Sequence, residues 1–215
     1  MLISFEGIDG CGKSTQINLL KLHFNEKGIV FSVFREPGGT AISEKIRSLL
    51  LHETHDMDPV TELLLFSAAR SQLISEKVIP LLKKNHIVIL DRFFDSTTAY
   101  QGFGRGSADL KSIHTLNRLA AHTIKPDLTF YLKIDPAAAA NRISSGSKDR
   151  MENAGSNFFK SVSDGYDQLA KGESRFHVLD AEQKPEAIHD EIVAIIGDFL
   201  QSREQGAANK TWKEV

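Results

Sequence analysis

The sequence of 215 residues predicts an α/β protein whose five-stranded parallel sheet has helices on both faces. Short apolar segments alternate along the chain with longer segments of helical periodicity. Several apolar segments also lack the apolar–polar alternation of a half-exposed strand, which is typical of a sheet buried on both sides. Because no repeat or linker divides the chain, we expect one domain over residues 1–202 and a polar tail over 203–215.

The N-terminal half of the chain predicts three strands and three helices. Ile17, Leu20 and Phe24 share one face of the first helix, and Gly28 follows its end. Thr40 is a suitable N-cap for the second helix. The strands are expected at 2–5, 29–34 and 87–90, the helices at 14–27, 40–51 and 60–82, and charged loops at 6–14, 35–40 and 91–105.

The C-terminal half predicts four helices and two strands. The helices are expected at 107–122, 136–144, 157–170 and 185–200, and the strands at 128–134 and 176–179. Residues 144–155 are polar and rich in glycine and serine, which predicts a mobile loop. The polar residues after 202 predict a frayed end. Ligands of such a sheet bind where its strands end, so the three charged loops are the expected site.

Composition and charge exclude several classes of protein. Hydrophobic residues make up 41% of the chain and charged residues 25%, which excludes a disordered or fibrous protein. The net charge of −2 gives no indication of a nucleic-acid partner. No apolar run approaches the roughly 18 residues of a membrane span, and residues 1–6 lack the basic start of a signal peptide. With Cys11 as the single cysteine, we expect a cytoplasmic protein without an internal disulfide.

Residues 7–14 match the phosphate-binding pattern G-x4-G-K-[ST], in which a glycine-rich loop follows a strand and opens a helix. Backbone N–H groups of such a loop hold phosphates, while Lys13 neutralises the β and γ oxygens and Ser14 binds Mg²⁺. The alternative is an ordinary glycine-rich turn. Cys11 is either a thiol with a lowered pKa or a small residue tolerated in a tight loop.

The strand at 87–90 ends in Asp91-Arg92, which helps to narrow the class of P-loop protein. An arginine after the acidic residue suits an anionic acceptor better than a water nucleophile, and no Asn-Lys-x-Asp segment for guanine is present. Asp91 is then expected to be an outer-sphere partner of Mg²⁺. A simple Asp-Arg pair at a strand end is the alternative. A different nucleotide or nucleoside kinase, and a P-loop module that only senses nucleotide, also remain open.

Four segments together resemble the thymidylate kinase family in their order and approximate spacing. They are residues 5–9 (Phe-Glu-Gly-Ile-Asp), 35–40 (Arg-Glu-Pro-Gly-Gly-Thr), 91–102 (beginning Asp-Arg-Phe) and 149–152 (Asp-Arg-Met-Glu). Phe93 departs from the tyrosine or histidine usual in the family. The resemblance implies the P-loop nucleoside monophosphate kinase fold, transfer of the γ-phosphoryl group of ATP to dTMP with Mg²⁺, and a homodimer.

The resemblance also implies an acceptor site for dTMP. Arg35 and Arg92 match its phosphate binders, and Phe66 and Arg70, one helical turn apart, match residues that stack on thymine and donate to its O4. Thymine presents an acceptor where cytosine presents an amino donor, so such an arginine selects between them. The alternatives are a core phenylalanine and a solvated arginine. The remaining residues expected to bind dTMP are Asp9, near the 3′-OH, Tyr100, under the sugar, Thr97 and Gln101.

The catalytic cations are expected in the loop at 144–155, the lid of the family. Some members carry an arginine between the P-loop glycines, whereas this chain has Gly10 and Cys11 there. Lys148 and Arg150 then supply the missing charge, unless they belong to a solvated charged loop, and Arg142 lies against the adenine. The expected catalytic residues are Lys13, Arg92, Lys148 and Arg150, the metal-binding residues are Ser14 and Asp91, and the ATP-binding residues are Gly7, Asp9, Gly10, Cys11, Gly12, Lys13, Ser14, Thr15 and Arg142.

Overall fold

A five-stranded parallel sheet forms the centre of the computed structural model, which describes residues 1–52, 55–143, 150–151 and 155–211, without the side chains of 204 and 206–211. The strand order is β2-β3-β1-β4-β5. This architecture confirms the predicted fold class. The strands are β1 (Leu2–Glu6), β2 (Phe31–Arg35), β3 (Ile87–Asp91), β4 (Leu128–Lys133) and β5 (Phe176–Asp180).

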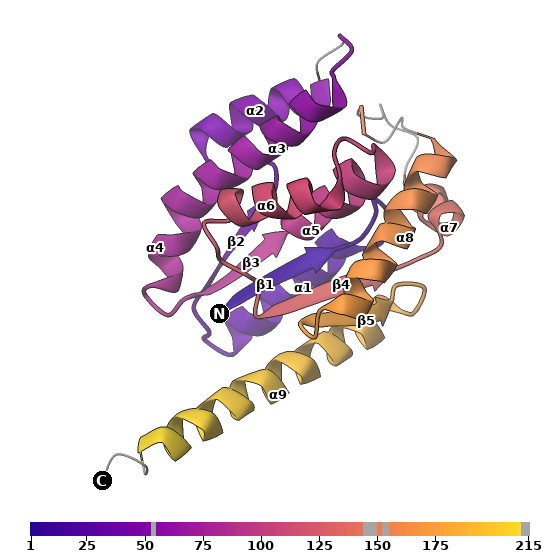
Figure 1. Ribbon diagram of the computed structural model, residues 1–215. Helices are drawn as coiled ribbons and strands as arrows, with labels where there is room; N and C mark the ends of the chain where they lie inside the picture. The colour runs from indigo at the N-terminus through magenta and orange to yellow at the C-terminus, as the bar shows by residue number, and fades with distance from the viewer. Residues whose placement is uncertain (53–54, 144–149, 152–154, 212–215) are drawn as a thin grey trace.

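Helices connect the strands and cover both faces of the sheet, with α1 and α9 on one face and α3, α5, α6 and α8 on the other (Figure 1). The helices are α1 (Lys13–Glu26), α2 (Ala41–His52), α3 (Pro59–Leu73), α4 (Ile79–Leu82), α5 (Phe94–Thr97), α6 (Leu110–Ala120), α7 (Pro136–Arg142), α8 (Ser156–Gly172) and α9 (Pro185–Thr211), with π-helical segments at Ile74–Val78 and Thr98–Gly104. Within the described ranges, no helix is both long and apolar enough to cross a membrane.

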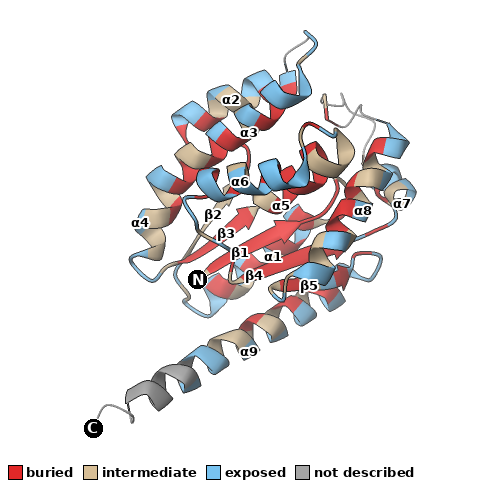
Figure 2. Ribbon diagram, viewed as in Figure 1, coloured by how far each residue is buried: buried red, intermediate tan, exposed pale blue. Residues whose placement is uncertain are grey.

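The three central strands of the sheet, β1, β3 and β4, are buried on both faces (Figure 2). Successive side chains of a strand point to opposite sides, so neighbours in β1 and β3 enter different apolar clusters. Leu2 and Val88 pack with Leu73 of α3, whereas Ile3 and Ile89 belong to the larger cluster that includes α1 and α9. This two-sided burial explains why the strands lack apolar–polar alternation in the sequence.

The segment at 91–105, which the sequence predicts to be a loop, is instead largely helical. It forms α5 and the π-helical segment Thr98–Gly104, which packs on α8. Glycines allow this close approach: a Cβ on Gly104 would lie 2.5 Å from the Phe158 ring, and one on Gly165 would lie 2.7 Å from Phe103. Tertiary packing has therefore overridden the poor helix propensity of a glycine-containing segment.

Two predicted helices also differ from the structure. The expected helix at 60–82 contains a π-helical segment at Ile74–Val78, next to Pro80, whose missing N–H cannot continue the α-helical ladder. The last helix continues to Thr211 instead of ending at Leu200, so the expected tail begins within α9. The division into a domain and a tail at residue 202 stays a prediction.

Candidate active site

The phosphate-binding loop connects β1 to α1, and three of its glycines have positive φ angles that other residues rarely adopt. Two of them also lie against backbone, since a Cβ on Gly7 would be 2.7 Å from the Leu132 carbonyl oxygen and one on Gly10 would be 2.4 Å from that of Ala139. Gly12 precedes the first turn of α1, where no side chain caps the helix. The exposed N–H groups of this turn are suited to an anion.

Lys13 opens α1, and its side chain folds back over the loop. Its Nζ donates to the carbonyl oxygens of Gly7 at 3.0 Å and Ile8 at 3.1 Å, and it lies 3.7 Å from the Cys11 sulfur. Cys11 itself is buried against the core, which agrees with the interpretation as a small residue in a tight loop. The loop thus holds a cation at the position where the motif requires one.

A cavity of about 580 Å³ lies over this loop at the carboxyl ends of the strands. It is lined by the predicted ATP-binding residues from Asp9 to Thr15 and by Arg142, Ala181 and Gln183. Arg142 donates to the Ala181 carbonyl oxygen at 2.9 Å, which fixes its guanidinium at the far end of the cavity from β3. Both residues predicted to bind metal, Ser14 and Asp91, line the same cavity.

Arg92 follows β3 and reaches across to the phosphate-binding loop. Its backbone has a φ of 72°, and its guanidinium donates to the Gly7 carbonyl oxygen at 2.8 Å and to Asp9 Oδ1 at 2.5 Å. Tyr100 donates to the other Asp9 oxygen at 3.2 Å. Burial opposes the charge of Asp9, but Arg92 and Lys13 together lower the pKa of its carboxyl to about 2. Asp9 is therefore ionised at neutral pH and holds Arg92 in place.

A buried carboxylate beneath Arg92 fixes the following turn. Glu6, the last residue of β1, accepts hydrogen bonds from the Phe93 amide at 2.8 Å, Ser96 Oγ at 2.6 Å and the Tyr166 hydroxyl at 2.9 Å. Burial and the nearby Asp95 raise the pKa of Glu6 to about 7. These bonds connect the end of β1, the turn at residues 93–96 and α8, next to Arg92.

A second cavity, of about 110 Å³, adjoins the first. The sequence predicts that Phe66, Arg70, Thr97, Tyr100 and Gln101 bind one ligand, and the structure brings all five to the wall of this cavity. They come from α3, from α5 and from the segment Thr98–Gly104, so folding is needed to bring them together.

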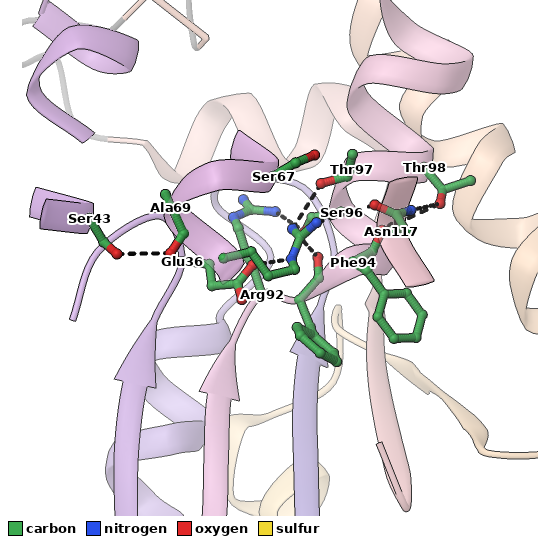
Figure 3. Close-up of polar contacts among 12 residues, drawn as sticks. Glu36, Ser43, Ser67, Ala69, Arg92, Phe94, Ser96, Thr97, Thr98 and Asn117 are labelled. Carbon is green, nitrogen blue, oxygen red and sulfur yellow. Dashed lines mark hydrogen bonds and ion pairs between the residues drawn. The ribbon is translucent and has the colours of Figure 1, made fainter. Parts of the chain in front are cut away.

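Arg70 is fully buried, and its hydrogen bonds connect several elements. Its Nε donates to Glu36 at 2.7 Å and its Nη2 donates to Thr97 Oγ1 at 2.8 Å and to the Phe93 carbonyl oxygen at 3.2 Å. Nη1 donates to Asn117 at 3.2 Å. Glu36, Thr97 and Asn117 converge on this point in Figure 3. Among the described residues, four of the five N–H groups are used, which leaves one on Nη1 for a ligand.

Glu36 is the counter-ion of Arg70 and is equally buried. Burial raises the pKa of its carboxyl to about 7, against the opposing effect of the arginine. Its second oxygen, Oε1, has no hydrogen-bond partner within the described part of the chain. The Arg70–Glu36 ion pair is therefore buried in the protein interior.

Two predicted site residues lie away from their expected positions, and a third falls outside the described residues. Arg35 lines the first cavity and not the second, and it pairs with Glu44 at 2.9 Å in an exposed position. Arg150 does not reach the phosphate-binding loop, because its guanidinium contacts Glu62 of α3 at 2.5 Å. Lys148 and most of the expected lid fall outside the described residues.

Sequence reasoning missed residues that only the fold brings to the site. Arg47 of α2 lines both cavities and donates to the Pro37 carbonyl oxygen at 2.9 Å. Leu51 and Met151 line the second cavity. Arg47 and Leu51 lie outside the segments that identify the site, and Met151 belongs to the segment 149–152 but had no expected role. Four residues in all are common to both cavities, namely Asp9, Glu36, Arg47 and Arg92.

Comparisons with known proteins agree with this geometry. Residues 5–192 match the family model described as thymidylate kinase. A thymidylate kinase from Chlorobaculum tepidum is 46% identical over 207 residues, which covers 91% of this chain and 96% of that protein. One from Caldanaerobacter subterraneus is 42% identical, covering 93% and 96%. The crystal structure of thymidylate kinase from Ehrlichia chaffeensis superimposes with a TM-score of 0.72 at 35% identity, covering 91% and 98%. The chain therefore belongs to the thymidylate kinase family.

Proposed function

We propose that this protein is a magnesium-dependent thymidylate kinase, which transfers the γ-phosphoryl group of ATP to dTMP and releases dTDP and ADP. The observation that carries the proposal is the pair of adjoining cavities. One contains the phosphate-binding loop, the other contains Phe66 and Arg70, and Arg92 lies in the wall that they share. Two nucleotides bound in this way would meet at their phosphates, which is the arrangement that phosphoryl transfer requires.

The first cavity is the proposed donor site. The N–H groups of residues 10–15 would hold the β- and γ-phosphates, and Lys13 would neutralise their charge. Arg142, bonded to Ala181, would lie against the adenine. The predicted ATP-binding residues, Gly7, Asp9, Gly10, Cys11, Gly12, Lys13, Ser14, Thr15 and Arg142, all belong to this loop or line this cavity, so they form one consistent set.

Ser14 and Asp91 are the proposed magnesium-binding residues. They offer a hydroxyl and a carboxylate, the oxygen ligands that Mg²⁺ prefers, and both line the donor cavity. Within the described ranges no cluster of three or more acidic, histidine or cysteine residues forms a cage for a metal. This fits Mg²⁺, which is usually held by one or two protein groups together with phosphate oxygens and water. When bound, the ion would neutralise charge on the transferred group.

The second cavity is the proposed acceptor site. Phe66 would stack on thymine, and the remaining N–H on Nη1 of Arg70 would donate to O4, with Thr97 and Gln101 beside the base. Cytosine would present an amino donor to this arginine and lose the hydrogen bond. Tyr100 would pack under the sugar and Asp9 would lie near the 3′-OH. Arg35 is proposed for the acceptor phosphate, although it lies at the donor side.

Charge neutralisation is the main requirement of the proposed reaction. A phosphate monoester with a second pKa of about 6 is largely dianionic at neutral pH, so no general base is needed. Lys13 and Arg92 are the proposed transfer cations, because both donate to the Gly7 carbonyl oxygen and both line the donor cavity, while Arg92 also lines the second. The catalytic role expected for Arg150 and Lys148 stays a prediction, and the contacts of Arg150 described below favour a different role for it.

A screen of nucleoside monophosphates tests the function. ATP consumption by the purified protein should be fastest with dTMP among all common nucleoside monophosphates. Lys13→Ala should lower kcat by about 10²-fold or more, because it removes charge from the transition state. Lys21→Ala, on an exposed turn of the same helix, is the matched control and should leave kcat unchanged. A Lys13→Ala protein with an unchanged melting temperature and full turnover would contradict the assignment.

We also propose that the protein is a homodimer and that it acts in the cytoplasm. Apolar side chains are exposed on two packed helices, Ile42 and Leu49 on α2 and Val60 and Leu64 on α3. In each helix the two residues are four or seven positions apart, so they share one side. Sedimentation of the purified protein should give twice the mass of the chain.

A further inference from the structure

Glu62 is a buried carboxylate, 1% exposed, in the first turn of α3, and none of the roles above uses it. Three side chains from other parts of the chain meet on it. Gln101 donates to Oε1 at 2.9 Å, the Arg105 guanidinium lies 3.5 Å from Oε1, and the Arg150 guanidinium lies 2.5 Å from Oε2. The carboxylate therefore connects α3 to the helical segment after β3 and to the residues that precede α8.

Arg150 makes further contacts that tie it to the end of α2. Its Nε donates to the Leu50 carbonyl oxygen at 2.9 Å, and its backbone N–H points to the Leu51 carbonyl oxygen at 3.5 Å. The guanidinium thus binds two helices at once, α2 through a carbonyl and α3 through Glu62. The N–H donors of a guanidinium point in fixed directions. Contacts to two helices therefore fix the position of the Arg150 side chain and of the backbone at residue 150.

The contacts of Arg150 lead directly to the acceptor cavity. Met151, the next residue, lines this cavity together with Leu51. Its sulfur accepts from Arg150 at 3.8 Å and from Arg105 at 3.7 Å. Arg150 therefore contacts both of these wall residues, Leu51 through its backbone N–H and Met151 through its guanidinium.

We propose that Glu62 is a positioning residue for the acceptor nucleotide, which holds Arg150 so that Met151 and Leu51 form one wall of the second cavity. The proposal rests on the assignment of that cavity to dTMP. It follows from the energetics of a buried carboxylate: leaving Glu62 without its arginine is costly, so the pair is strongly maintained. Glu62 lines neither cavity, and it acts through Arg150 and Met151 and through the Gln101 side chain that donates to it.

This role makes a prediction that differs from that of a catalytic cation. Contacts that shape a binding wall act equally on the bound substrate and on the transition state, so their loss raises KM with little change in kcat. A cation that stabilises the transferring phosphoryl group would instead lower kcat when removed. Steady-state kinetics with dTMP as the varied substrate separates the two.

The experiment compares Glu62→Gln, Arg150→Gln and the double variant. Each single substitution should raise the KM for dTMP about tenfold, with kcat and the KM for ATP within about twofold of the parent. The double variant should be no worse than the more affected single variant, because both substitutions remove the same contact. A fall in kcat at constant KM, or additive effects of the two substitutions, would overturn the proposal.

Two controls make the result specific. Arg105→Gln removes the longer ion pair from the same carboxylate and one donor to the Met151 sulfur, but it leaves the Arg150–Glu62 pair in place, so the KM for dTMP should stay within about twofold. Phe66→Ala tests the cavity itself. If Phe66→Ala leaves the KM for dTMP unchanged, the assignment of the second cavity to dTMP fails. If Phe66→Ala raises this KM but Glu62→Gln and Arg150→Gln do not, only the positioning role of Glu62 is overturned.

Thermal melting accompanies every variant. If Glu62→Gln does not fold, because two arginines lose their carboxylate, Arg150→Gln and Met151→Ala carry the test. Met151→Ala removes part of the wall without touching the ion pair, and it should raise the KM for dTMP in the same way. An unchanged KM in both folded variants overturns the proposal.

Discussion

Arg70 illustrates how one side chain can belong both to the buried network of the fold and to the proposed acceptor site. Its guanidinium bonds to Glu36, Thr97, Asn117 and the carbonyl oxygen of Phe93, and it lies in the wall of the acceptor cavity. A residue that reads a base needs a fixed orientation, because a mobile donor would accept either of two bases. The four bonds supply that fixed orientation.

Arg70→Ala should therefore affect both stability and selectivity. The free energy of unfolding should fall by about 3–5 kcal/mol, since Glu36 is left buried without its counter-ion. The preference for dTMP over dCMP should weaken at the same time, which the ratio of kcat/KM values measures. Urea unfolding checks the first effect, and the control is Asn117→Ala, which removes one bond to Arg70 and the two bonds that the Asn117 amide donates to Phe94 and Thr98, but leaves the Arg70–Glu36 pair in place. An unchanged ratio of efficiencies would show that Arg70 does not read the base.

Local motifs explain which site residues the sequence could predict. The phosphate-binding loop is one continuous segment that its motif identifies. Phe66 and Arg70 are one helical turn apart, which predicts a shared helix face, and the resemblance to thymidylate kinases assigned them to dTMP. Arg47 has no such local signal, because it reaches both cavities only through the packing of α2. Arg150 shows the opposite problem: its charge was evident in the sequence, but its partner, Glu62, lies on a distant helix.

At the scale of elements, most strands and helices could be predicted because their apolar pattern is local. The segment from Phe94 to Gly104 could not, since its helical form depends on close packing with α8 at Gly104 and Gly165. The end of α9 was missed for a related reason. Its last turns are polar, and polarity alone predicted an irregular tail.

The contact between the phosphate-binding loop and α7 can be tested with Gly10→Ala. The added Cβ would lie 2.4 Å from the Ala139 carbonyl oxygen in a backbone with positive φ, so the loop must shift. The KM for ATP should rise about tenfold or more, because a displacement of about 1 Å in a positioning loop has large effects.

Gly28→Ala is the matched control for this substitution. Gly28 also has a positive φ, of 65°, but nothing lies within 4 Å of its added Cβ. It should lower the free energy of unfolding by about 1–2 kcal/mol through backbone strain and leave the KM for ATP unchanged. Equal effects of both variants on the KM would show that the contact with Ala139 is not the cause.

The position of the candidate site depends on five parallel strands whose carboxyl ends meet at one edge of the sheet. The sequence predicted this number of strands and their parallel arrangement, because each is apolar and separated from the next by a helix. It did not predict the order β2-β3-β1-β4-β5, which is decided by pairing between distant segments. That order places β1 beside β3, and with it the phosphate-binding loop beside Arg92.

The stability of the molecule should depend on pH through Glu6. Its pKa in the folded protein is about 7, above the ordinary value of 4.5, because of burial and Asp95. Between these values the folded state binds more protons than the unfolded state, so the contribution of Glu6 is fully present below about pH 4.5 and is lost as the pH rises through 7. Glu6→Gln cannot titrate, and it should remove this part of the decline.

Urea unfolding of the parent and of Glu6→Gln at several pH values from about 5 to 8 measures the effect. The difference between their free energies of unfolding should change across this range in favour of the variant at high pH. Parallel curves for the two proteins would contradict a raised pKa of Glu6.

The wall of Asp9, Glu36, Arg47 and Arg92 that separates the two cavities has a thermodynamic consequence. If the two cavities bind the two nucleotides as proposed, both ligands share these lining residues, and their binding equilibria are then linked by a coupling free energy. Linkage makes this coupling reciprocal: the factor by which ATP changes the affinity for dTMP equals the factor by which dTMP changes the affinity for ATP. A substitution in the shared wall that changes this coupling should therefore change the effect of ATP on dTMP binding and the effect of dTMP on ATP binding by the same factor.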